Sequence, residues 1–203
     1  MNTETVPAVL LAAGLSRRLG RPKALVSVNG RTLVEWAHER LLAANCTPVV
    51  VVNAAIVAEV KAMLPSARIV VNPQPDLGRT GSLQLGLRTF VDGLGQELQR
   101  LVVVPVDRPC WDVHLLKALL EHEGNVAPAH DGRKGHPVVL GSEALVAVSQ
   151  AQQDTPLRDL VHFAPVSVFA PWLNMNIDTP EDVDQLMAEG EHLSSCFSES
   201  EGI

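Results

Sequence analysis

Short, continuous apolar runs dominate the first half of the chain. Four of them are rich in valine and leucine and do not alternate with polar residues, as is typical of parallel strands covered on both faces. They span Val6–Ala12, Pro48–Asn53, Arg68–Asn72 and Leu101–Val106. Between them, apolar residues recur at helical spacing. These predicted helices span Thr32–Ala44, Ala55–Leu64 and Thr80–Phe90. The alternation predicts an α/β fold with a mostly parallel central sheet flanked by helices.

The pattern loosens in the second half, where shorter elements are predicted. Helices are expected over Trp111–His122, Gly141–Gln150 and Pro156–Phe163, and strands over Asn125–Ala129, Pro137–Gly141, Val166–Phe169 and Leu173–Ile177. The strands on either side of residues 130–136 form a small β excursion. Thr179 and Pro180 begin a last helix, as N-cap and first-turn residues. We expect a single domain over residues 1–190 and a flexible polar tail over residues 191–203.

Charge and composition narrow the functional classes. The net charge of −7 argues against a general nucleic-acid or membrane-surface binder, and the 3% aromatic content gives few stacking platforms for single strands. The first apolar run is too short to span a bilayer. Three widely spaced cysteines without a CxxC pair suggest neither zinc nor a disulfide framework. Free buried thiols in a reducing, cytoplasmic setting are expected.

A cationic loop, LAAGLSRRLGRPKAL, directly follows the first predicted strand. Gly14 permits a sharp turn, and Arg17, Arg18, Arg21 and Lys23 supply cationic donors. Parallel sheets bind ligands at the carboxyl ends of their strands, so a phosphate-bearing ligand is expected here. A merely solvated basic loop is the alternative. The GxxxxGK[ST] and GxGxxG patterns are absent, which excludes a Walker loop and the usual dinucleotide fingerprint.

Two further residues have both a functional and a structural interpretation. Asp107 follows an apolar strand and precedes Pro109. Its carboxylate suits Mg²⁺ against phosphate oxygens, or caps the next helix. His136, in a Gly-His-Pro turn, contacts a substrate or only shapes the turn. Zinc is not expected at His136, because no second ligand lies at a useful spacing.

The loop resembles the LxxGxSxRMGxxK loop of nucleotidyltransferases of the molybdenum-cofactor type. These are relatives of sugar-1-phosphate nucleotidyltransferases and of the isoprenoid-pathway cytidylyltransferase. The resemblance implies a Rossmann-like nucleotidyltransferase fold and a loop that holds NTP phosphates. The matching positions are Leu11, Ala12, Ala13, Gly14, Ser16, Arg18, Gly20 and Lys23. Alanine at position 13 resembles the cytidylyltransferases, whereas guanylate-transferring relatives tend to have glycine there.

Four later stretches match the same family in the same order. Gly78 and Ser82 resemble the segment that closes over the base. VVVPVDRP resembles the motif of the metal aspartate, here Asp107, and GRKGHPVVL places His136 toward the second substrate. NMNIDTPEDV resembles DIDTPeDl, which implies that Asp178 or Asn176 completes the Mg²⁺ site.

The resemblance implies an enzyme that transfers CMP from CTP to molybdopterin cofactor or another small phosphorylated acceptor. Arg18, Lys23 and Asp107 would be its catalytic residues. A molybdoenzyme would be a possible partner, and neither nucleic acid nor a membrane is expected. The alternative is an NAD(P)H-dependent oxidoreductase or a non-catalytic cofactor-binding chaperone on the same scaffold.

Overall fold

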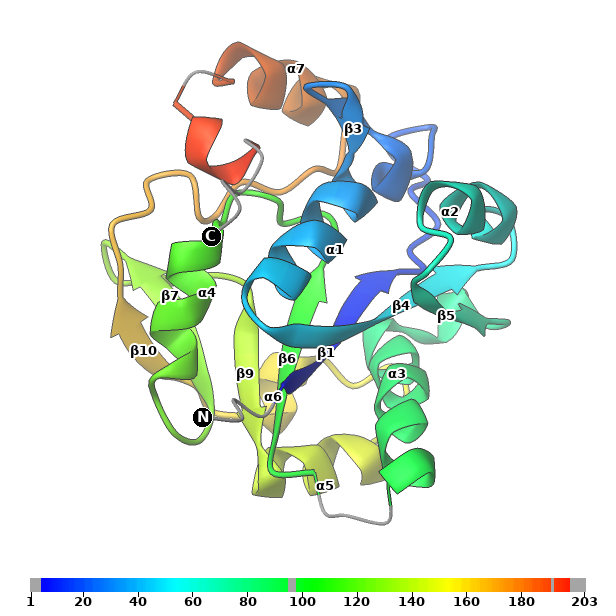
Figure 1. Ribbon diagram of the computed structural model, residues 1–203, viewed down its shortest axis with the longest axis vertical. Coiled ribbons are helices and arrows are strands. Elements are labelled where there is room, and N and C mark those ends of the chain that lie inside the picture. The colour runs from blue at the N-terminus through cyan, green and yellow to red at the C-terminus, as the bar shows by residue number, and fades with distance from the viewer. Residues whose placement is uncertain (1–4, 95–97, 191, 198–203) are drawn as a thin grey trace.

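One eight-stranded sheet organises the molecule (Figure 1). The computed structural model describes residues 5–94, 98–190 and 192–197. The strands lie in the order β10-β7-β9-β6-β1-β4-β5, with β8 paired to β7. All pairs are parallel except those that β9 makes with β6 and β7 and that β8 makes with β7. The strands are β1 Val6–Ala12, β4 Cys46–Asn53, β5 Arg68–Asn72, β6 Arg100–Pro105, β7 Val126–His130, β8 Arg133–Lys134, β9 Val138–Gly141 and β10 Ala164–Ser167; a separate hairpin pairs β2 Ser27–Val28 with β3 Arg31–Thr32.

Helices cover both faces of this sheet. One hydrophobic cluster joins the sheet to α1, α2, α4 and α7, and a second joins it to α3, α5 and α6. The helices are α1 Leu33–Ala43, α2 Val57–Met63, α3 Arg79–Leu94, α4 Val113–Leu120, α5 Ser142–Gln150, α6 Leu157–Leu160 and α7 Pro180–Ala188, with 3₁₀ turns η1 Lys23–Leu25, η2 Pro75–Leu77 and η3 Ser194–Cys196. The predicted fold class, a mostly parallel α/β sheet with a small β excursion, is confirmed.

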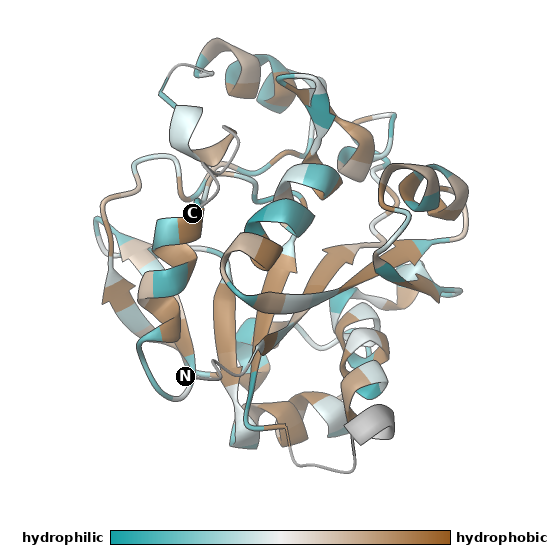
Figure 2. Cartoon of the chain, viewed as in Figure 1, coloured by the Kyte–Doolittle hydropathy of each residue, from teal (hydrophilic) through white to brown (hydrophobic). Residues whose placement is uncertain are grey.

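The central strands are buried because both faces of the sheet are covered. Residues 49–52 of β4 are fully buried, and β1, β6 and β9 are largely hydrophobic along their length (Figure 2). Gly86 lets α3 approach β1 closely: a Cβ atom there would lie 2.7 Å from Cγ1 of Val9. A side chain at this position would push α3 off the sheet.

Side-chain caps fix where three helices begin. Thr32 and Glu35 form a capping box at α1, and Thr179, the predicted N-cap, forms one with Asp182 at α7. At α4 the cap is Asp112, whose carboxylate accepts from the Leu115 N–H at 2.8 Å. Asp107 is therefore not needed as a helix cap.

Three expectations differ from the structure. The helix expected over Pro156–Phe163 is only the single turn α6, Leu157–Leu160. Leu173–Ile177 forms turns and extended loop rather than a strand, although Leu173 and Ile177 are buried. Residues 192–197 of the expected tail pack against the core. Leu193 and Phe197 are buried there, and Phe197 packs edge-to-face on Trp36 at 6.0 Å. Residues 191 and 198–203 of that tail lie outside the described residues.

Two further observations concern the cysteines and the possibility of a membrane-spanning helix. The three cysteines are free and buried, as expected, and burial raises the pKa of Cys46 and of Cys110 to about 12. Among the described residues, no helix has both the length and the apolarity that a membrane crossing requires.

Candidate active site

A cavity of about 360 Å³ opens at the carboxyl ends of β1 and β6. Leu11 of β1 lies in register with Pro105 of β6, so the segments that follow both strands meet there. Four cationic side chains and three carboxylates line the cavity: Arg17, Arg18, Lys23, Arg79, Asp76, Asp107 and Asp178. In a chain of net charge −7, this local excess of cations favours a polyanionic ligand.

Asn53, at the end of β4, fixes the turn after β1. Its buried amide donates to the carbonyl of Ala13 at 3.1 Å and to that of Gly14 at 3.4 Å, and its Oδ1 accepts from the Ala55 N–H. A trans peptide directs its N–H opposite to its carbonyl. The next two amides, of Gly14 and Leu15, therefore point away from Asn53.

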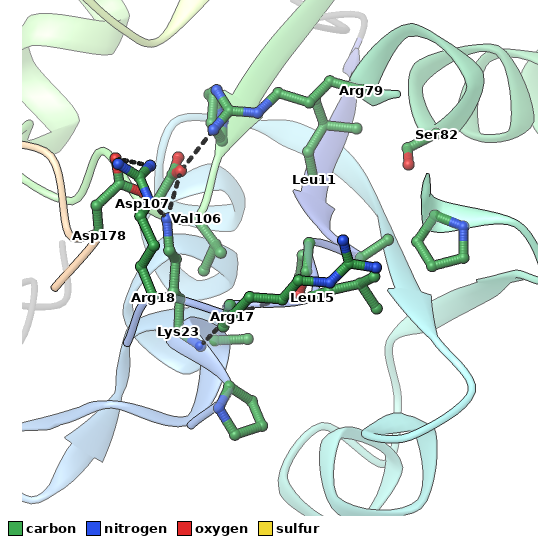
Figure 3. A pocket seen from close by; sticks show the side chains of 18 of the residues that line it. Leu11, Leu15, Arg17, Arg18, Lys23, Arg79, Ser82, Val106, Asp107 and Asp178 are labelled. Carbon is green, nitrogen blue, oxygen red and sulfur yellow. Dashed lines mark hydrogen bonds and ion pairs between the residues drawn. The ribbon is translucent and has the colours of Figure 1, made fainter. Parts of the chain in front are cut away.

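The rest of the loop bends back on itself through Ser16. Ser16 has a positive φ of 51°, its carbonyl accepts from the N–H of Leu19 and of Gly20, and its hydroxyl accepts from the Lys23 N–H at 2.9 Å. This folding brings the Lys23 side chain from the end of the loop into the cavity beside Asp107 (Figure 3).

Lys23 joins the two carboxylates of the site. Its Nζ donates to Asp107 at 3.3 Å and makes a shorter contact with Asp178. The backbone fixes the same juxtaposition, because the Ile177 N–H donates to the Asp107 carbonyl at 2.9 Å. Lys23 and Asp107 side chains are 13% and 7% exposed, so this network is shielded from water. Breaking a buried ion pair of this kind typically costs several kcal/mol.

Two arginines complete the network. Arg18 pairs with Asp178 at 2.7 Å and Arg79 with Asp107 at 2.8 Å, as the dashed lines in Figure 3 show. Burial alone would raise the pKa of Asp178. The hydrogen bond and charge of Lys23, then Asn176 and Arg18, outweigh burial and lower that pKa. Asp178 therefore stays ionised in the folded protein.

The donor set suits a hard divalent cation. Asp107 and Asp178 both contact one ammonium group, so their oxygens enclose a space of cation size. The side-chain amide N–H of Asn176 donates a hydrogen bond to the Asp178 carboxylate. The buried Oδ1 of Asn176 has no hydrogen-bond partner among the described residues. Carboxylate and amide oxygens are ligands that Mg²⁺ accepts.

The structure brings most, but not all, of the predicted site residues into this cavity. Those that line it are Leu11, Ala12, Ala13, Gly14, Ser16, Arg18, Lys23, Ser82, Asp107 and Asp178. Asn176 lines an adjoining open hollow with Arg18 and Asp178. Gly20 and Gly78 shape backbone instead, with φ of 73° and 114°. At Gly78 a Cβ atom would lie 2.6 Å from the Gln153 carbonyl oxygen.

His136 lies in a second cavity, next to the first. Burial, with a contribution from the charge of Arg108, lowers the pKa of His136 to about 4. Its imidazole is therefore neutral at physiological pH, and its buried Nδ1 has no hydrogen-bond partner among the described residues.

The low pKa of His136 predicts an acid-sensitive stability. The unfolded chain, with the ordinary value of 6.5, binds this proton more readily than the folded chain. The free energy of unfolding should fall as the pH drops from 6.5 to 4, by up to about 3 kcal/mol. Urea midpoints of His136→Gln should fall less over this range. The exposed control His122→Gln should follow the wild type, and parallel curves for all three proteins would contradict the assignment.

Sequence reasoning missed three residues of the site. Asn53 ends a predicted strand, and a polar residue at the carboxyl end of a parallel strand is the available signal. Arg79 directly follows Gly78 in a stretch already matched to the family. Asp76, paired with Arg17 at 2.5 Å across the cavity mouth, has no comparable signal.

A parallel α/β sheet with a cationic loop after its first strand, and two carboxylates facing that loop, defines a nucleotide-binding enzyme of the nucleotidyltransferase class. Comparison with known proteins gives the family. Residues 8–168 match the MobA-like NTP transferase domain, and the chain belongs to that family.

The relatives found include one named as an oxidoreductase and several named as nucleotidyltransferases. Nicotine blue oxidoreductase of Paenarthrobacter nicotinovorans is 35% identical, over 88% of this chain and 92% of that protein. A molybdenum cofactor guanylyltransferase of Xanthomonas euvesicatoria is also 35% identical, over 89% and 94%. The molybdenum cofactor cytidylyltransferase of Escherichia coli is 23% identical, over 87% and 93%.

Solved structures share the fold. Rv0371c of Mycobacterium tuberculosis superposes with a TM-score of 0.75 at 20% identity, covering 93% of this chain and 100% of that one. A manganese complex of the same protein gives 0.70 at 18% identity, covering 91% and 99%.

Proposed function

We propose that this enzyme transfers CMP from CTP to a phosphate of the molybdenum cofactor and releases pyrophosphate. One observation carries the proposal: Lys23, Asp107 and Asp178 meet in the cationic cavity at the carboxyl end of β1. A triphosphate requires cationic donors for its charge and a carboxylate pair for its metal ion. Names of the family's relatives support the acceptor.

The chemistry is an in-line displacement at the α-phosphorus. An acceptor phosphate oxygen forms the new bond to phosphorus, and the bond to the β-phosphate oxygen breaks as pyrophosphate leaves. The nucleophile is already ionised at neutral pH, so no general base is required. Arg18 and Lys23 hold the phosphates and neutralise the leaving group. The loop residues Leu11–Ser16 approach the nucleotide with their backbone, beside Ser82.

Asp107 and Asp178 would hold a divalent cation, Mg²⁺, with the amide oxygen of Asn176 as a further ligand. When bound, the cation neutralises charge on phosphate oxygens and aligns them. The manganese complex of Rv0371c supports a divalent ion in this fold.

The choice of CTP rests on the resemblance of Ala12 and Ala13 to the cytidylyltransferases of this family; both residues line the cavity, and their small side chains would leave the base near backbone groups. GTP is the competing donor, since relatives named guanylyltransferases are 28% to 35% identical. A pyrophosphate-release assay with each of the four NTPs, Mg²⁺ and molybdopterin cofactor tests both the transfer reaction and the choice between CTP and GTP. Release with CTP at least tenfold above GTP supports the proposal; the reverse order would establish guanylyl transfer, and no release with any NTP would refute transfer.

The oxidoreductase name of one relative at 35% identity favours a second candidate function. An NAD(P)H-dependent reductase, or a cofactor chaperone serving a molybdoenzyme in the reducing cytoplasm, would use the same cavity. Arg17 and Arg18 would then contact a 2′-phosphate. Loss of absorbance at 340 nm with NADPH and a quinonoid acceptor, indifferent to Mg²⁺, would favour this function over transfer.

A further inference from the structure

A second cavity of about 400 Å³ adjoins the nucleotide cavity. The two share three lining residues, Leu11, Arg79 and Pro105. A group bound in the second cavity would therefore lie beside Asp107 and the phosphates of a nucleotide in the first. This is the position that a nucleophile attacking the α-phosphate must occupy.

The walls of the second cavity are largely apolar. They include Leu83, Val103, Pro156 and Leu157, whereas the charged lining residues Asp154 and Arg158 are exposed to solvent. The neutral imidazole of His136 also lines the cavity, and its Nδ1 is buried without a hydrogen-bond partner among the described residues. Thr80 also lines the cavity, but its hydroxyl already donates to the Thr155 carbonyl at 2.6 Å. A ligand with several hydroxyl groups would find few buried partners along these walls, which is unfavourable.

Arg79 stands at the junction of the two cavities. It is the first residue of α3, and Figure 3 shows its side chain extended toward Asp107. Its Nη2 donates to Asp107 Oδ2 at 2.8 Å, and its side chain is 67% exposed. A guanidinium carries five N–H donors in a fixed plane, which suits two phosphate oxygens at once. Because the side chain is mostly exposed, the donors that do not contact Asp107 remain available to a ligand.

We propose that Arg79 is a catalytic residue that binds the acceptor's phosphate and aligns it with the α-phosphate of the nucleotide. The second cavity takes the body of that acceptor, a flat aromatic or heteroaromatic ring system packed against the apolar walls and the imidazole of His136. Sugar and polyol phosphates are disfavoured. This inference rests on the proposed function for its catalytic part, whereas the binding part stands independently.

A binding experiment tests the cavity without turnover. The protein is saturated with Mg²⁺ and α,β-methylene-CTP, which occupy the first cavity, and titrated calorimetrically with phenyl phosphate or glycerol 3-phosphate. Phenyl phosphate should bind at least about tenfold more tightly than glycerol 3-phosphate, because the apolar walls suit only its ring. Arg79→Ala should weaken phenyl phosphate at least about tenfold, the loss typical of a charge-assisted hydrogen bond. Arg88→Ala, an exposed arginine of the same helix, is the matched control and should bind like wild type.

Kinetics tests the catalytic part. Arg79→Ala should lower kcat/KM for molybdopterin cofactor by about 50-fold or more with its affinity for CTP changed less than about threefold, and Arg79→Lys should recover only part of that loss. A merely structural Arg79 would lower the melting temperature and affect both substrates alike. Arg79→Lys also serves as the test protein if the alanine variant does not fold.

The outcomes separate the two claims. Equal binding of the two probes, or wild-type binding of phenyl phosphate by Arg79→Ala, overturns the inference even if wild type releases pyrophosphate. Absence of pyrophosphate from wild type refutes the proposed function and Arg79 catalysis. If phenyl phosphate still bound more tightly than glycerol 3-phosphate, the second cavity would remain supported as a binding site for an aromatic anion.

Discussion

Asp107→Asn should lower kcat for pyrophosphate release by about 100-fold or more, because it removes the charge that pairs with Arg79 and that, in the proposed mechanism, would hold a divalent cation beside the phosphates. The amide preserves size and shape, so packing around β6 should survive. Steady-state rates at saturating CTP and acceptor, with Mg²⁺ varied, give the effect directly. The Mg²⁺ concentration for half-maximal rate should rise in parallel.

The control for Asp107→Asn is Asp131→Asn, an exposed residue in the turn after β7. Asparagine tolerates the positive φ of 47° at this position, so the variant should fold and react like wild type. Near-wild-type turnover and Mg²⁺ dependence in Asp107→Asn would show that the metal and the reaction lie elsewhere.

Lys23→Met should also lower turnover by about 100-fold, since the positive charge beside the leaving pyrophosphate is lost. Its second effect is on the ligand-free protein. Without the ammonium group, the two largely buried carboxylates lose their shared partner and keep only the exposed Arg18 and Arg79. The free energy of unfolding should fall by about 3 kcal/mol, as is typical when one member of a buried ion pair is removed.

Mg²⁺ should stabilise Lys23→Met more than wild type, because Lys23 no longer competes for the same two carboxylates. Melting temperatures with and without Mg²⁺, alongside pyrophosphate release, measure both effects. Lys61→Met, at an exposed position of α2, is the matched control and should change neither. If Lys23→Met melted like wild type and gained nothing from Mg²⁺, the lysine would not occupy the cation position.

Local patterns sufficed to predict the central strands. β1 and β5 have the predicted bounds, and β6 begins and ends one residue earlier than expected. These strands are buried on both faces, so their continuous valine-rich runs report burial directly. The Leu173–Ile177 prediction failed for the same reason. Leu173 and Ile177 are fully or nearly fully buried, but turns such as the one from Leu173 N–H to the Ala170 carbonyl bury them without strand pairing.

The tail shows what composition hides. Small polar residues after residue 190 suggested a flexible end, but three residues among them, Leu193, Cys196 and Phe197, are buried in the core. Phe197 and Trp111 contact the fully buried Arg40, whose guanidinium lies 4.2 Å from the Trp111 ring centroid. Such long-range partners have no local signature.

The site was predictable where the chain itself brings residues together and less so elsewhere. Gly14 and Lys23 belong to one loop, and the spacing of their motif was visible in the sequence. Asp107 and Asp178 were each placed after an apolar run. That Lys23 joins them depends on the Ile177–Asp107 backbone contact, a tertiary feature. The role of Arg79 could not be predicted from the sequence, because its contact with Asp107 depends on the start of α3 lying close to the end of β6.

A crystal structure with α,β-methylene-CTP and Mg²⁺ would show where the nucleotide and the metal ion bind. We expect the triphosphate against the loop between Gly14 and Lys23, a metal ion on Asp107 and Asp178, and the Lys23 ammonium moved from these carboxylates to a phosphate oxygen. Nucleotide bound elsewhere, with Lys23 still joining the two carboxylates, would contradict this expectation.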